Sequence, residues 1–187
     1  MGDMARPSIS NSRPRDMVIS LGVLLVPILL ISWWFTRTPA DAPVQTVDWQ
    51  SVLAQSRAVA PYPLLGPVGL PDTWVATKAE WDKTGEPGVN REAAPGNTWQ
   101  LGMLSPDQVY VGLTQRDAAG PALIAQISRA GVQDGTSVVG GVTWTRWVSD
   151  DTRTRTLSRV DGSVTIVVSG DMSYAGLEAF ASTLRSS

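Results

Sequence analysis

Residues 142–169, VTWTRWVSDDTRTRTLSRVDGSVTIVVS, carry the pattern that decides the fold of most of this 187-residue chain. Alternating and β-branched residues predict three strands here, at residues 142–148, 153–160 and 163–169. Asp161-Gly162 is a preferred dipeptide for a two-residue hairpin between the last two strands. Because the connections are short, these strands can pair only in antiparallel fashion.

The same signals occur earlier in the chain. Strands are predicted at residues 74–81, 97–104 and 108–115, and helices at about 48–60, 121–130 and 173–184. Asp48 and Ser173 are suitable helix caps, Pro121 suits a first helical turn, and Gly131 lies just past a helix end. The order of elements predicts an α+β domain: a largely antiparallel β-sheet of about six strands with helices on its faces. A PsbP-like fold has this general makeup.

A second decisive stretch is residues 17–35, MVISLGVLLVPILLISWWF, which carries no charged side chain. At about 1.5 Å per residue a helix of this length covers roughly 28 Å, close to the roughly 30 Å hydrocarbon core of a bilayer. We predict a transmembrane helix, with Trp33, Trp34 and Phe35 as its anchor at the membrane interface. A cleaved signal peptide is the alternative, but its apolar region is usually shorter, and Pro43 directly follows Ala40-Asp41-Ala42, the A-x-A sequence just after the span.

Charge asymmetry predicts the orientation of this helix. Residues 1–16 form a basic tail with Arg6, Arg13 and Arg15, whereas only Arg37 closely follows the span. The positive-inside rule therefore places the N-terminus in the cytoplasm and the C-terminal part outside the plasma membrane, as a single-pass protein. Residues 36–47 lack periodicity and predict a linker, so residues 48–187 form the extracytoplasmic domain.

Composition excludes several kinds of chemistry. The chain has no histidine and no cysteine. It therefore has no His-based triad, no His-ligated or Cys-ligated metal, no thiolate nucleophile and no disulfide. A Ser–Lys dyad would need Lys78 or Lys83, and neither lies in a Ser-x-x-Lys motif. We predict no catalytic residues and no cofactor, and hence a protein that is not an enzyme.

Two acidic groups are the candidates for a metal site. They are Glu80, Asp82 and Glu86, and the pair Asp150-Asp151, and they lack the spacing of a calcium loop. We interpret them as ordinary loop acids and predict no metal site. Gly140-Gly141 lacks the context of a phosphate-binding loop and is interpreted as a turn or bulge.

Arginine and tryptophan residues are the best candidates for binding. Trp144, Arg146 and Val148 share one face of a predicted strand, and Arg153, Arg155 and Arg159 share a face of the next, so an arginine–aromatic docking surface is possible. The interaction residues we select are Trp144, Arg146, Trp147 and Arg155. Because Trp144 and Trp147 point to opposite faces, one of them should be core. The alternative is a solvated sheet face on which arginine stems cover the tryptophans.

Five segments together resemble a family of actinobacterial membrane-anchored proteins known as domain of unknown function 4245. These are Arg15-Asp16-Met17, Leu70-Pro71-Asp72-x-Trp74, Val109 to Gln115, Val139 to Trp144 and Ile166 to Gly170. The resemblance covers about residues 13–184. It implies an actinobacterial envelope protein with an outward-facing domain, and it supplies no catalytic residues.

These observations together favour an accessory subunit of a membrane-protein complex. We expect the helix to hold the chain in the bilayer and the outer domain to bind an integral membrane-protein complex. The actinobacterial respiratory supercomplex of cytochrome bc and oxidase is the first specific partner we consider. The alternative is an envelope carrier or sensor domain that encloses a lipid or small molecule. Nucleic acid is not an expected partner, because acidic residues outnumber basic ones in the outer domain.

Overall fold

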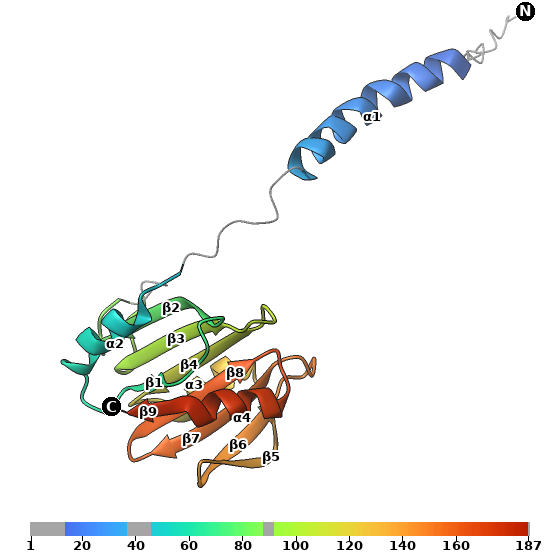
Figure 1. Cartoon of the computed structure of the whole chain (residues 1–187). Coiled ribbons are helices and arrows are strands. Elements are labelled where there is room, and N and C mark those ends of the chain that lie inside the picture. The colour runs from blue at the N-terminus through green and yellow to red at the C-terminus, as the bar shows by residue number, and fades with distance from the viewer. Residues whose placement is uncertain (1–13, 37–45, 88–91, 187) are drawn as a thin grey trace, which may run out of the picture. The chain divides into compact units, whose positions relative to one another are not determined.

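The computed structural model describes residues 14–36, 46–87 and 92–186, and it divides into two compact units, residues 1–44 and 45–187 (Figure 1). The predicted linker lies almost wholly outside the described residues, and so does most of the predicted basic tail. The second unit already includes Val47, whose N–H donates to the carbonyl of Ala76 at 2.9 Å.

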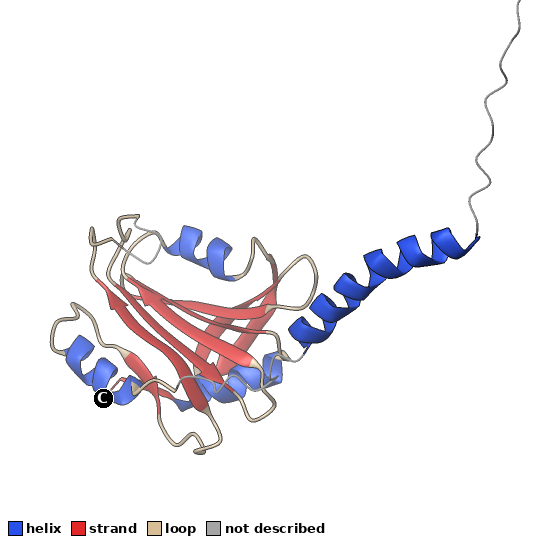
Figure 2. Cartoon of the chain, turned by 90° about the horizontal axis from the view of Figure 1, so that it is seen from above, coloured by secondary structure: helices blue, strands red, loops and turns tan. Residues whose placement is uncertain are grey.

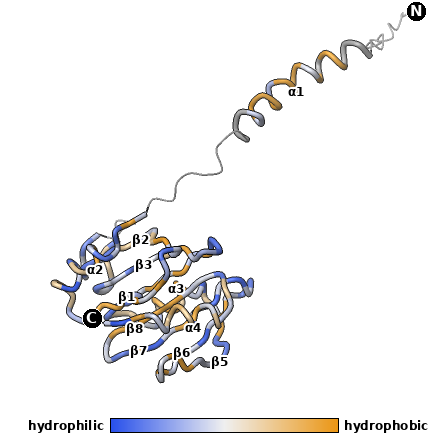
Figure 3. Tube along the Cα trace, viewed as in Figure 1, coloured by the Kyte–Doolittle hydropathy of each residue, from blue (hydrophilic) through white to orange (hydrophobic). Residues whose placement is uncertain are grey.

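The first unit contains helix α1, Pro14–Thr36, with Pro27 inside it. Most of its described residues are apolar, as the hydropathy colouring of Figure 3 shows, and their side chains are exposed. Trp33 is one of them, whereas the side chains of Trp34 and Phe35 lie outside the described part of the chain. Within the described ranges, no helix combines the length and the apolar character needed to cross a membrane.

The second unit contains the remaining helices and all strands of the described chain. The helices are α2 (Trp49–Arg57), α3 (Gly120–Ile127) and α4 (Tyr174–Thr183). The strands are β1 (Leu65–Pro67), β2 (Val75–Asp82), β3 (Thr98–Leu104), β4 (Tyr110–Arg116), β5 (Val132–Val139), β6 (Val142–Val148), β7 (Arg155–Asp161), β8 (Val164–Gly170) and β9 (Leu184–Ser186).

Seven of these strands form one antiparallel sheet in the order β2-β3-β4-β8-β7-β6-β5, while β1 and β9 form a separate antiparallel pair. Helices α2 and α4 cover one face, which we call the inner face, and α3 lies on the opposite, outer face against β8 (Figure 2). The predicted α+β architecture with a large antiparallel sheet is therefore confirmed.

The core lies between the inner face and the helices α2 and α4. Leu101, Leu113 and Leu157 come from three different strands of the sheet, and Leu177 and Phe180 come from α4; each is at most 1 % exposed. Complete burial of a side chain of this kind contributes roughly 1.5–3 kcal/mol. The packed inner face therefore supplies the largest stabilising term and fixes the position of α4.

Helix boundaries follow local signals. As predicted, the side chains of Asp48 and Ser173 cap α2 and α4, accepting from the N–H groups of Ser51 and Gly176 at 3.3 Å each. Helix α3 ends earlier than predicted, because Arg129 and Ala130 adopt left-handed backbone angles, with φ of 56° and 54°.

The sequence predicted about six strands, and the structure adds three to those six: β5 joins the large sheet, and β1 and β9 form a separate pair. The sequence QDG within β5 resembles a turn, but Gly135, with φ of 82°, is part of a bulge opposite β6. Gly140-Gly141 is a turn, as predicted, with positive φ at both residues. The next hairpin is shifted by one residue, since Asp161 pairs with Val164 and leaves Gly162-Ser163 as the loop.

A buried glutamine ties the irregular segment before β1 to the sheet. Gln115 of β4 is 1 % exposed, and its amide oxygen accepts from the N–H of Leu65 at 2.6 Å while its nitrogen donates to the carbonyl of Pro63 at 3.2 Å. The indole N–H of Trp99 donates to the carbonyl of Leu65 at 3.0 Å. These bonds satisfy backbone groups that the prolines prevent from entering the large sheet.

We expect Gln115→Met to destabilise the full-length chain by about 2–4 kcal/mol. Methionine fills similar space but leaves the buried groups of Leu65 and Pro63 without partners, at about 1–3 kcal/mol each. Urea unfolding followed by tryptophan fluorescence measures the change. Gln55→Met, at an exposed position of α2, is the matched control. Equal midpoints for the two variants would contradict the role of Gln115.

Candidate functional site

The candidate interaction residues lie on strands β6 and β7, where alternation decides which way each side chain points. Arg146 pairs across the strands with Leu157, which is fully buried on the inner face. Trp147 pairs with Thr156 and therefore points to the outer face. The four interaction residues selected from the sequence are thus divided between two faces, as the opposite directions of Trp144 and Trp147 require.

Arg146 joins two strands to α4. Its Nε donates to the hydroxyl of Ser137 on β5 at 2.5 Å, and its terminal nitrogen lies 2.7 Å from Oε1 of Glu178. The same carboxylate oxygen accepts from the Ser137 hydroxyl at 2.6 Å. The guanidinium also lies 4.7 Å from the centre of the Tyr174 ring. Arg146 is therefore engaged by contacts within the unit.

The other arginines near these strands are engaged in the same way. Arg155 lies 5.7 Å from the Tyr174 ring and donates to the carbonyl of Met172 at 3.4 Å. Arg159 lies 5.2 Å from the Trp144 ring and pairs with Asp161. Arginine–aromatic contacts thus exist as the spacing suggested, but most of them involve Tyr174 of α4. Arg153, which the sequence placed in a strand, lies in the loop before β7.

The two tryptophans behave as alternation requires. Trp144 is 3 % exposed and belongs to the hydrophobic core. Trp147 is half-buried on the outer face, where its indole N–H donates to the hydroxyl of Ser158 at 2.7 Å. Only Trp147 is therefore available to contact a partner, and its role in binding remains a prediction.

The outer face of β5, β6 and β7 has an unusual composition. Cross-strand pairs place Thr136 beside Thr145 and Val138 beside Thr143. Val138 and Val160 are 71 % and 66 % exposed. No outward-pointing residue on these three strands, all of which the structure describes, is charged. We call this surface the β5–β7 patch; it consists of Thr136, Val138, Thr143, Thr145, Trp147 and Val160.

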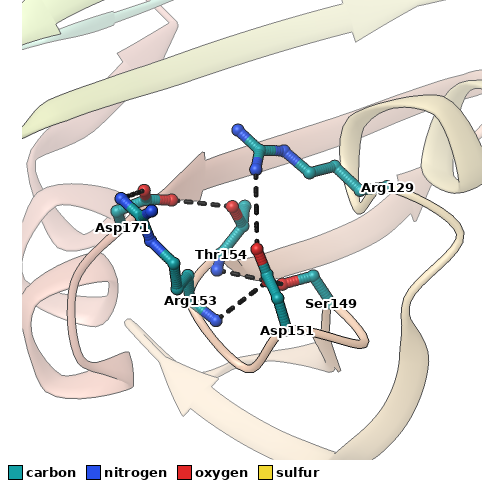
Figure 4. Close-up of polar contacts among 6 residues, drawn as sticks. All are labelled: Arg129, Ser149, Asp151, Arg153, Thr154 and Asp171. Carbon is teal, nitrogen blue, oxygen red and sulfur yellow. Dashed lines mark hydrogen bonds and ion pairs between the residues drawn. The ribbon is translucent and has the colours of Figure 1, made fainter. Parts of the chain in front are cut away.

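The aspartates near this region organise a loop. The carboxylate of Asp151 accepts from the hydroxyl of Ser149 at 2.5 Å and from the backbone N–H of Arg153 at 3.1 Å, and these bonds lower its pKa (Figure 4). Asp171 accepts from the hydroxyl of Thr154 at 2.7 Å and pairs with Arg153 at 3.3 Å. These contacts hold the β6–β7 loop against the segment that precedes α4.

Two acids of the other candidate metal group, Glu80 and Asp82, are each bound to a different partner. Glu80 pairs with Lys78 at 3.0 Å, and Asp82 accepts from the side chain of Gln100 at 3.0 Å. Among the residues that the structure describes, no three acidic side chains gather into a possible metal site. Glu80 and Asp82 therefore lie on strand β2 and not in a loop, as the sequence had suggested, and each has its own partner there.

Hollows on the described surface are small or shallow. One of about 510 Å³ lies beside Tyr110, Arg129 and Arg153, and one of about 200 Å³ is lined by Trp144, Arg159 and other residues. Side chains fill the space between the sheet and α4, where Trp99 and Phe180 are at most 1 % exposed.

Comparison with known proteins yields one match. The model of a family described as "Protein of unknown function (DUF4245)" matches residues 10–184. No curated protein and no solved structure matches the chain. The matched range contains α1 and almost all of the second unit, including the β5–β7 patch.

We expect Glu178→Gln to lower the free energy of unfolding by about 1 kcal/mol or less near pH 7, the range for a partly exposed ion pair. The hydrogen bonds from Ser137 and then Arg146 lower the pKa of Glu178 below its ordinary value of 4.5. Since the folded-state pKa is the lower one, this stabilisation is complete above about pH 4.5 and is lost as the pH falls through the folded value.

Unfolding curves at several pH values between 7 and 3 test this expectation. The difference between Glu178→Gln and the natural chain should shrink as the pH falls, and Glu86→Gln, at an exposed loop position, is the matched control. A difference that stays constant down to pH 3 would show that the carboxylate charge contributes nothing.

Proposed function

The chain belongs to the DUF4245 family, and we propose that it is a non-enzymatic, membrane-anchored accessory subunit whose second unit docks onto an integral membrane-protein complex. The observation that carries the proposal is the β5–β7 patch, an exposed sheet surface without charge. Interface cores are depleted in charged residues and enriched in aromatic ones, which describes this patch and its tryptophan.

The distribution of charge on β6 and β7 is the reverse of the usual one. A sheet with one solvated face normally directs its charged residues outward. Here Arg146, Arg155 and Arg159 lie on the inner face, while threonine, valine and Trp147 lie outside. Since a partner that covers this surface would bury no unpaired charge, docking there avoids the main desolvation cost of association.

Anchoring in the membrane is the second part of the proposal. Residues 17–35 carry no charge, and they fall within α1, which runs from Pro14 to Thr36. The basic tail supports a cytoplasmic N-terminus and an extracytoplasmic second unit. Because a single helix needs packing contacts to select a partner in the bilayer, we assign the complex to the same membrane.

The chemistry of the second unit supports a binding role over catalysis. Without histidine or cysteine, the candidate bases are Lys78 and Lys83, and Lys78 pairs with Glu80 and donates to Gln100. The hydroxyl of Ser137 donates to Glu178 and accepts from Arg146, and these neighbours lower the pKa of Glu178, which makes its carboxylate a weaker base. The complex that fits these features is a bioenergetic or transport assembly, and a respiratory supercomplex is the first to test.

A ligand carrier is the alternative function. The hollow of about 200 Å³ supports it, because apolar walls with Trp144 there adjoin the guanidinium groups of Arg159 and Arg185. Its volume is below the roughly 300–1,000 Å³ typical of ligand pockets, whereas the hollow of about 510 Å³ beside Tyr110, Arg129 and Arg153 lies within that range; the interior beneath α4 is packed. The comparison with a PsbP-like fold stays part of this proposal and adds no argument about the ligand.

We expect Val160→Lys to reduce recovery of the partner complex in mild-detergent purification at least tenfold, because it places a charge in the docking surface. Val160 is 66 % exposed, so the substitution should leave the melting temperature unchanged. Val68→Lys, at a residue that is 58 % exposed outside the patch, is the matched control. Equal recovery with both variants would exclude the patch as the docking site.

The two tryptophans provide a paired test of the same surface. Trp147→Ala should weaken binding by about 2 kcal/mol or more, the effect of losing an interface anchor, with a small loss of stability. Trp144→Ala should instead lower the free energy of unfolding by about 3–5 kcal/mol, because it opens a cavity in the core. If both variants only destabilise the chain, the patch is structural.

N-terminal sequencing of the mature protein from membranes tests the anchor. We expect the chain to retain residues 17–35, because the candidate cleavage site is poor. A reporter fused after residue 187 should be accessible from outside the cell. A mature N-terminus between residues 39 and 44 would show instead that the segment is a cleaved signal peptide.

A further inference from the structure

The large sheet has two edge strands, β2 and β5, and they differ in how they are protected. Strand β2 carries Lys78, Glu80 and Asp82, has a bulge after Ala76, and receives a hydrogen bond from Val47 on its free side. Charges, bulges and covering segments are the means by which proteins prevent edge strands from pairing with other chains. Strand β2 uses all three.

Strand β5 lacks this protection over its second half. Its bulge and Asp134 lie in the first half, so that Thr136 to Val139 form a regular ladder with β6. This stretch contains no charge, and among the described residues no strand or segment pairs with its free edge. An uncharged, regular and exposed edge is a template for another strand.

Exposed apolar side chains gather at the same edge. Val132 and Val138 of β5 are 68 % and 71 % exposed, and Val142, directly after the hairpin turn, is 41 % exposed. Elsewhere in the second unit, exposed large apolar residues occur singly, which is normal for a protein surface. The concentration of valines at β5 is an observation independent of its missing strand partner.

We propose that β5 pairs in antiparallel fashion with β5 of a second copy of this chain, so that the two seven-stranded sheets become one. A second copy fits this edge, because a two-fold axis at Val138 places Val138 opposite its own copy and Ser137 opposite Val139, and it brings no like charges together. A two-fold axis through this stretch is the common symmetry of homodimers. This inference goes beyond the proposed function, since it needs neither the membrane partner nor the anchor.

The geometry of self-pairing also has a consequence for the β5–β7 patch. With the two-fold axis perpendicular to the sheet, the outer faces of both copies point to the same side. The two patches then form one continuous uncharged surface, about twice the area of a single patch. A contact of four residues per strand is short, so we expect the dimer to dissociate readily. Covalent cross-linking is therefore the way to detect it.

Because the sequence contains no cysteine, a cross-link through one introduced cysteine can form only at that position of the chain. In the full chain in native membranes, Val138→Cys introduces one thiol at the centre of the edge. Directly opposed residues of antiparallel strands have Cβ atoms about 4.5–5.5 Å apart, within reach of a disulfide or a short dimaleimide. We expect oxidation or dimaleimide treatment to yield a dimer of this chain, identified by its mass.

Two further single-cysteine variants serve as matched controls. Val160→Cys lies on the same outer face but on β7, and Val59→Cys lies near the end of α2; both positions are more than half exposed. We expect at least tenfold less dimer from each. Efficient cross-linking of Val160→Cys would show that the copies stack face to face, which would overturn edge pairing.

A non-covalent measurement complements the cross-linking. In mild detergent, sedimentation of the natural chain should show a concentration-dependent dimer, and Val138→Lys should weaken its association at least tenfold while Val160→Lys leaves it unchanged. Loss of partner recovery in Val160→Lys with an intact dimer would separate this inference from the docking proposal. A monomer at all concentrations, or a Val138→Cys adduct only with another protein, would overturn the proposal.

Discussion

The packing of α4 against the inner face of the sheet is the constraint on which the second half of the fold depends, and beside it lies the ion pair between Arg146 and Glu178. Its atoms connect β6 to α4, and the shared bond with Ser137 adds β5 to the same cluster. Since the Arg146 side chain is 32 % exposed, the carboxylate adds a favourable contact and is not required for the guanidinium to lie there. Burial of Trp144, and of Leu157 opposite Arg146, fixes the face of β6 that meets α4, and alternation along the strand then directs Trp147 outward.

The uncharged outer face of β5 to β7 is a consequence of which face of the sheet α4 covers. Once the arginines of β6 and β7 lie beneath α4 and its aromatic ring, only hydroxyl, valine and indole side chains remain for the outer face. Helix α3 packs mainly on β8. The proposed docking surface and the proposed dimer edge are thus adjacent parts of one uncharged region. Both remain uncharged because α4 covers the face that carries the arginines.

The N-terminal half of the second unit depends on a different constraint, the satisfaction of backbone groups in a proline-rich segment. Gln115 and Trp99 provide side-chain partners for backbone groups of Pro63 and Leu65, and Tyr62 of the segment itself donates to the carbonyl of Asn97. Burial raises the pKa of Tyr62, so its hydroxyl stays protonated and donates to the carbonyl of Asn97. Side chains thereby replace a ladder and hold β1 near enough to pair with β9.

The sequence by itself determined the local elements and the partition of strand residues between two faces, because alternation and capping are properties of neighbouring residues. It predicted six of the strands, the caps Asp48 and Ser173, and the opposite directions of Trp144 and Trp147. Only the tertiary structure decided that β5 joins the sheet despite its turn-like QDG, and that Arg146, Arg155 and Arg159 face α4 rather than solvent. Those outcomes depend on contacts between residues up to 41 positions apart, such as Ser137 and Glu178, which no local pattern encodes.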